Sequence, residues 1–168
     1  MTPQQITTLR AAIFGEPTAA ALLSAGNSAG LRDYLNGAST FIAWRTLVSQ
    51  DEIMQNGFDW TRVDNLSIAK ARIWEWLFNN DARSFNPSKL NVRAGIDQCW
   101  VGTAADLAVR AAVYVHCKRA VTQAEKLMAT GTGTTAVPGL MTFQGEVSDL
   151  DSALLIFKDD GTIWTPQG

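Results

Sequence analysis

Apolar side chains recur at spacings of three and four along most of the first 130 residues, which is the period of helices with one buried face. The clearest stretch is FDWTRVDNLSIAKARIWEWLF at residues 58–78. Asp64 can accept hydrogen bonds from the free N–H groups of a first helical turn, and an apolar stripe follows it. That stripe consists of Leu66, Ala69, Ile73, Trp76 and Leu77. The pattern therefore predicts a central helix that begins near Asp64 and buries this stripe.

Tryptophan is concentrated around the same stripe, because four of the six indoles lie between residues 58 and 100. Each buried aromatic side chain removes roughly 150–250 Å² from water, so this segment is expected to anchor the core. Trp74 and Phe78 fall off the stripe, which indicates that a second surface of the same helix is covered too. The expected core anchors are Trp60, Ile73, Trp76, Leu77, Trp100 and Tyr114.

Helix-start signals place further elements on both sides of the central helix. Three pairs have the spacing of a capping box, namely Thr2 with Gln5, Ser49 with Glu52, and Thr103 with Asp106. They predict a helix from Pro3 to Gly15, one from Gln50 to Asn56 ended by Gly57, and one long helix from about Ala104 to Ala129. The inward side of the long helix is expected to carry Leu107, Ala111, Tyr114, Val115, Val121 and Met128. Shorter helices are expected over 18–25 and 28–36 and after Pro87. Residues 39–48 fit a buried helix better than an alternating strand, although their length leaves both open.

The chain changes character at Thr130, where the run TGTGTT is typical of a hinge or linker. Apolar runs then follow, and a turn at Asp159-Asp160-Gly161 between two of them indicates a hairpin. The predicted fold is mainly α, a multi-helix bundle with a long C-terminal helix followed by an extended, β-containing C-terminal arm. Its predicted parts are a helical body over 1–130, a Gly/Thr linker over 131–135 and a β-prone arm over 136–168.

Charge is low and unevenly distributed. Charged residues make up 18% of the chain, against about 25% in a typical domain, which fits either a surface covered by partners or an ordinary low-charge monomer. The net charge of −2 argues against a general nucleic-acid binder. Residues 146–168 carry one lysine and five acids, a net −4, and suit either a basic partner surface or a solvated end. With no apolar run long enough to span a membrane and no leader pattern, the expectation is a soluble cytoplasmic chain with reduced thiols.

The residues that could carry chemistry do not form a recognisable set. His116 is the only histidine and adjoins Cys117, but neighbouring helical residues point about 100° apart. Together with Cys99 they also fall short of the four ligands of a structural zinc site. Paired acids at 51–52 and 159–160 are explained by helix starts and turns, although the latter, with Asp149 and Asp151, could gather a weak calcium ion. We expect no catalytic, cofactor-binding or metal site.

The run at residues 58–78, the following NVRAGIDQCWVGTAADLAVRAAVYVHCKRAVTQAEKLMATGTGTT and the β-prone tail together resemble the small head–tail connector (adaptor) proteins of tailed bacteriophages. The likeness extends from about Phe41 onward. It implies a structural protein of the virion, without enzymatic activity, that is made in the host cytoplasm. It also implies a homo-oligomeric ring beneath the portal protein, joined to a tail or nozzle protein. DNA would pass through this ring without sequence-specific recognition, and no membrane would be involved.

On this interpretation the arm is the expected docking segment, because strand addition to a partner sheet would satisfy its backbone groups. Its candidate interface residues are Leu140, Phe143, Leu154, Ile156, Phe157, Ile163 and Trp164. The basic side of the long helix could face DNA or a neighbour, or could simply be solvated, and comprises Arg110, Lys118, Arg119 and Lys126. Two other functions stay open: another neck or tail protein, such as a tail completion or terminator protein, and a small ligand-binding domain or enzyme.

Overall fold

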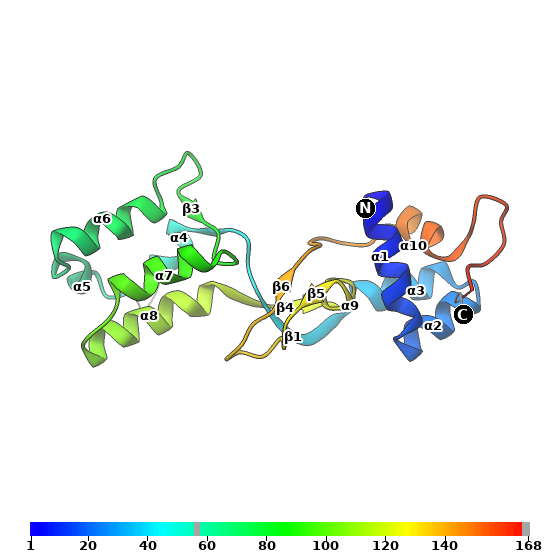
Figure 1. Ribbon diagram of the computed structural model, residues 1–168, viewed down its shortest axis with the longest axis horizontal. Helices are drawn as coiled ribbons and strands as arrows, with labels where there is room; N and C mark the ends of the chain where they lie inside the picture. Colours follow the sequence, from blue (N-terminus) through cyan, green and yellow to red (C-terminus); the bar gives the residue numbers. More distant parts are fainter. Residues whose placement is uncertain (56–57, 166–168) are drawn as a thin grey trace. The chain divides into compact units, whose positions relative to one another are not determined.

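The computed structural model describes residues 1–55 and 58–165. These residues form ten α-helices and six short strands, so the fold is mixed and rich in helix. The chain divides into two compact units (Figure 1). Unit 1 comprises Met1–Ala43 and Ala120–Gly168, and unit 2 comprises Trp44–Arg119. Unit 2 is therefore inserted between the two halves of unit 1, a division that differs from the predicted body, linker and arm.

Unit 1 is built on helices from both ends of the chain. The amino-terminal helices are α1 (Pro3–Phe14), α2 (Pro17–Ser24) and α3 (Ser28–Asn36), and the carboxyl-terminal half adds α9 (Gln123–Leu127) and α10 (Asp149–Ile156). Figure 1 shows α10 beside α1 and α3. The predicted capping box of Thr2 and Gln5 is confirmed, and α1 ends at Gly15 as expected. One apolar core joins these helices, with Leu9, Leu31 and Leu155 fully buried in it.

Most of the segment 39–48, which fits a helix better by periodicity, belongs to a strand that ends at Trp44. β1 (Ala38–Trp44) pairs with β4 (Lys118–Thr122), and β5 (Ala129–Thr130) pairs antiparallel with β6 (Leu140–Met141). The helical interpretation was wrong because the segment is rich in β-branched and aromatic residues such as Thr40, Phe41 and Ile42. These side chains lose rotamer freedom in a helix but pack well on a pleated sheet.

The single long helix predicted over 104–129 is interrupted. α8 (Ala104–His116) ends at Cys117, β4 follows, and α9 then begins with Thr122 as its cap. Thr122 and Glu125 form a capping box, in which the Thr122 hydroxyl accepts from the Glu125 N–H while the Glu125 carboxylate accepts from the Thr122 N–H. This box marks a new helix start inside the predicted helix. It has the same spacing as the boxes that were recognised in the sequence.

The segment predicted as a β-prone arm contributes a helix to the core of unit 1. Ser148 and Asp151 form a further capping box at the start of α10, and Leu155 and Ile156 are fully buried. What remains of the predicted hairpin is an isolated bridge between Phe157 and Ile163 around the 159–161 turn. Residues 166–168 of the predicted arm lie outside the described residues.

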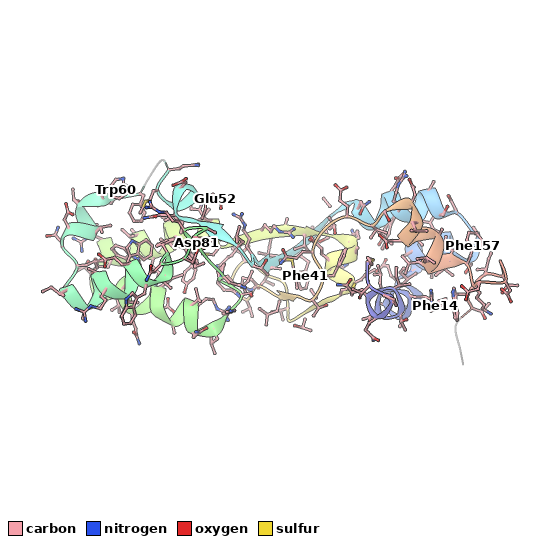
Figure 2. The ribbon with its side chains drawn as sticks, turned by 90° about the horizontal axis from the view of Figure 1, so that it is seen from above. Phe14, Phe41, Glu52, Trp60, Asp81 and Phe157 are labelled. Carbon is pink, nitrogen blue, oxygen red and sulfur yellow. The ribbon has the colours of Figure 1, made fainter. Side chains whose placement is uncertain are left out.

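The predicted Gly/Thr linker is an ordered loop that closes around Phe41 of β1 (Figure 2). The Ile42 N–H donates to the Gly133 carbonyl at 2.7 Å, and the Gly139 N–H donates to the Ile42 carbonyl at 2.9 Å. A Cβ on Gly133 would lie 2.1 Å from the Phe41 ring, and one on Gly139 would lie 2.4 Å from it. The glycines of this run therefore allow a close approach to an aromatic ring, a use different from the flexibility that the sequence indicated.

The described residues of unit 2 form five helices and one short strand pair that lie wholly within the unit. The helices are α4 (Gln50–Ile53), α5 (Trp60–Asp64), α6 (Ile68–Leu77), α7 (Leu90–Cys99) and α8, and β2 (Val48–Ser49) pairs antiparallel with β3 (Ser84–Phe85). The capping box of Ser49 and Glu52 is confirmed, but α4 ends at Ile53. The predicted helix end at Asn56 and Gly57 lies outside the described residues.

The central helix starts later than predicted and buries a different face. Asp64 ends α5, and Ser67 caps α6 by accepting from the Lys70 N–H. Trp74 is buried, with its ring 5.3 Å from Trp100 and 5.1 Å from Phe78. The expectation that Trp60 and Trp76 anchor the core was wrong, since they are 52% and 67% exposed. The pairing of Trp74 with Phe78 one turn later turns α6 so that the side of Trp76 faces outward. Among the other expected anchors, Trp100 is fully buried, and the partly buried ones are Ile73, Leu77 and Tyr114.

Candidate functional site

Helix α8 of unit 2 turns its polar side chains inward. Asp106 pairs with Arg62 of α5, and Arg110 lies 3.5 Å from the Asp97 carboxylate of α7. The Tyr114 hydroxyl donates to Asp97 at 3.0 Å. These groups hold α8 against its neighbours through ion pairs and hydrogen bonds, in addition to the buried Val109 and Val113.

The consequence is an apolar face on the outside of the helix, which we call the α8 face. It contains Leu107, Ala111 and Val115, spaced one helical turn apart, with Ala104 and Ala108 beside them. Leu107 is 43% exposed and Val115 is 72% exposed. The sequence placed Leu107, Ala111 and Val115 on the inward side, and this prediction was wrong. A helix that is apolar on two sides, as α8 is at Val109/Val113 and at Leu107/Val115, indicates a second covering partner, and this signal was available in the sequence.

A second apolar surface lies between α6 and α7 in the same unit. A cavity of about 500 Å³ opens there, with Ile73, Leu77 and Val92 among its apolar lining residues. Trp76, Lys89 and Asn91 also line it. Among the described residues that line the cavity, Lys89 carries the one charge. We call this cavity the α6–α7 groove.

The contacts on the inner side of α8 perturb titration in unit 2. Hydrogen bonds from Arg62, and then from Thr103, lower the pKa of Asp106 to about 2. Burial, followed by the hydrogen bond to Asp97, raises the pKa of Tyr114 above its usual value. Both residues therefore keep their charge states across the physiological pH range, which suits a structural role for the inner side of α8.

The residues of the candidate basic surface do not share a helix. Arg110 lies on α8, Lys118 and Arg119 lie on β4, and Lys126 lies on α9 of unit 1. The Lys118 ammonium group is 5.1 Å from the Trp44 ring centroid and 5.6 Å from that of Tyr114. The expectation of one basic helix side was wrong because the helix ends at His116.

Most of the candidate arm residues are internal to unit 1. Phe143 and Ile156 are buried, and Phe157 and Ile163 pack against the same core. Leu140 and Leu154 remain exposed. The Trp164 ring lies 4.0 Å below the Arg10 guanidinium group, which donates to the Leu154 and Leu155 carbonyls at the end of α10. Formation of α10 places these side chains in intramolecular contacts, so the arm does not present them as a docking strand.

The candidate thiol and histidine groups are placed for packing. Burial raises the pKa of Cys99 to about 11 and that of Cys117 to about 12, so both thiols stay protonated near neutral pH. The Cys99 sulfur donates to the Lys70 carbonyl at 3.4 Å, and the His116 carbonyl accepts from Arg45 at 3.1 Å. Within residues 1–55 and 58–165, no group of three or more His, Cys, Asp or Glu side chains could hold a metal ion.

The carboxylates weighed for calcium binding have other partners. Asp151 accepts from the amino group of Met1 at 2.7 Å and from Ser148, and Asp149 pairs with Arg32. Asp160 accepts from the N–H and the hydroxyl of Thr162. In the part of the chain that the structure describes, no helix is long and apolar enough to cross a membrane.

Comparison with protein-family models, with curated proteins and with solved structures gives no match. The α8 face and the α6–α7 groove are therefore candidate functional surfaces on structural grounds alone.

Proposed function

We propose that this chain is a structural subunit of a bacteriophage neck, a head-to-tail adaptor that forms a ring beneath the portal and joins the capsid vertex to the tail around the DNA channel. The observation that carries the proposal is the α8 face, where a helix directs its charged side chains inward and leaves Leu107 and Val115 exposed. The likeness of residues 41–168 to connector proteins supplies the biological setting.

The α8 face is chemically suited to protein contact. Covering a leucine or valine side chain fully contributes roughly 1.5–3 kcal/mol, so a two-residue contact is modest for a single subunit. Repetition around a ring raises the total, because each subunit already held in the ring presents its neighbour at a high effective concentration. The alanines at 104, 108 and 111 allow a partner backbone to approach closely.

Fewer structural observations support the two alternative functions, another neck or tail protein and a small enzyme. Another neck or tail role, such as tail completion, would use the same exposed face, and the binding partner distinguishes it. A thiol-based enzyme is disfavoured because Cys99 and Cys117 are buried with raised pKa values.

The proposal is tested by negative-stain electron microscopy of the full chain mixed with the portal protein from the same genome. The expected result is an added ring of density on one side of the portal, absent when either protein is imaged alone. A truncation at Thr130 is unsuitable as a variant, because it removes α10 from the core of unit 1. Portal particles without added density at saturating protein would rule out portal docking, and the same assay with tail proteins would then identify the alternative.

A further inference from the structure

The α6–α7 groove is suited to bind a helix that presents apolar side chains with negative charge beside them. Trp76 stands exposed at the groove, where an aromatic side chain can cover a large apolar area. Lys89 adds the one charge of the lining, and the structure gives it no ion pair among the described residues. Two acids, Glu75 and Asp81, are sequence neighbours of lining residues. Their negative charges are balanced by two nearby basic residues, Arg72 and Arg83.

A matching ridge is present on unit 1 of the same chain. Leu150 and Leu154 lie one turn apart on α10 and are both exposed, although Leu155 and Ile156 of this helix are fully buried. We call Leu150 and Leu154, with the acids at their amino-terminal end, the α10 ridge. These acids are Glu146, which is exposed, and Asp149, which pairs with Arg32.

The two units also carry opposite net charges. Unit 1 contains four basic and eight acidic side chains, which gives −4. Unit 2 contains ten basic and eight acidic side chains, which gives +2. Association of unit 1 from one copy with unit 2 from another is therefore favoured by charge, and like units repel each other.

We propose that the α6–α7 groove of one copy binds the α10 ridge of a second copy. Such a contact joins two different surfaces, so it is heterologous and can propagate from copy to copy until a ring closes. Leu150 and Leu154 enter the groove beside Trp76, and Glu146 lies near Lys89. The inference rests on the proposed function, in which copies adjoin in a ring, and it names the surfaces that meet.

Site-directed crosslinking between two differently tagged chains tests this contact. One chain carries Lys89→Cys and the other carries Glu146→Cys, and the mixture is treated with a short bismaleimide both free and on portal particles. The native thiols are buried and protonated, so they stay unmodified in the folded chain. Because each chain has a single introduced thiol, a crosslinked heterodimer must join two copies.

The expected yield of heterodimer is several times that of a control pair in which Lys126→Cys, at an exposed position of unit 1 on α9, replaces Glu146→Cys. Adding Leu150→Asp to the ridge chain should return the yield to the control level. Equal yields for the two pairs, or no effect of Leu150→Asp, would overturn the groove and ridge contact. If ring density forms on the portal but this crosslink does not, the groove and ridge contact is wrong and the proposed function stands. Absence of ring density with the unmodified chain overturns the proposed function.

Discussion

At the scale of residues, Trp74 and Trp76 show how two neighbouring positions of one helix divide between core and surface. Trp74 lies within an aromatic cluster with Phe58, Phe78 and Trp100. Trp76 lines the α6–α7 groove and is mostly exposed. The same indole side chain therefore serves the stability of unit 2 at one position and an accessible surface at the other.

Substitution of these two residues should have very different effects on stability. Trp74→Ala is expected to lower the free energy of unfolding by about 3–5 kcal/mol, because it leaves a cavity among aromatic rings. Trp76→Ala is expected to change it by only about 0.5 kcal/mol, as surface substitutions do. Urea denaturation followed by far-UV circular dichroism measures both. Equal losses would contradict the burial assigned to α6.

At the scale of elements, the loop over 131–139 depends on the contact between its glycines and Phe41. Gly133 has φ +69°, and Gly161 in the 159–161 turn has φ +79°, so both disfavour a side chain by backbone conformation. Only at Gly133 would a Cβ also meet the Phe41 ring, whereas nothing lies within 4 Å of the one at Gly161. Comparing alanine substitutions at Gly133 and Gly161 therefore separates the free-energy cost of the backbone conformation from the cost of the clash with Phe41.

Gly133→Ala is expected to destabilise the protein by roughly 1–3 kcal/mol more than the matched Gly161→Ala variant, because Phe41 must move to admit the methyl group. Differential scanning calorimetry of the two variants gives the comparison. If they lose the same stability, the loop does not close on Phe41, and the segment is the linker that its composition indicates.

Local signals in the sequence predicted the elements whose hydrogen bonds close within a few residues. The capping boxes at Thr2, Ser49 and Thr103 were recognised, and each forms in the structure. The boxes at Thr122 and Ser148 have the same local chemistry and could have been found in the same way. Alanine-rich periodicity before Thr122 favours a continuous helix, and the apolar runs after Ser148 favour strands, so other local signals compete with these two boxes.

Other features depend on contacts between distant parts of the chain and carry no local signal. The approach of Gly133 and Gly139 to Phe41 joins segments about 90 residues apart, so composition alone indicates only flexibility there. The outward turn of the α8 face follows from ion pairs with Arg62 and Asp97, which lie on other helices. Sequence periodicity identified α8 as amphipathic but could not assign which side is covered within the subunit.

In the whole molecule, unit 2 is inserted in the chain between the two halves of unit 1, and each unit has candidate binding surfaces of its own. Unit 1 takes helices from both chain ends into one core, and it carries the net negative charge. Unit 2 carries the α8 face and the α6–α7 groove. A subunit of this kind can contact one partner through one surface while another surface meets an adjoining copy, which is what assembly into a ring requires.

We infer that the α8 face mediates assembly, and co-sedimentation of a Leu107→Asp, Val115→Asp double variant with portal particles tests this. The control variant, Leu47→Asp with Val137→Asp, places two charges at exposed apolar residues that belong neither to α8, nor to the lining of the groove, nor to the ridge. Both variants should fold, as checked by thermal unfolding. The α8 variant should lose about tenfold or more of the bound protein, since two buried apolar contacts contribute more than 1.4 kcal/mol. The control should bind like the unmodified chain. Equal binding by the two variants would contradict the claim.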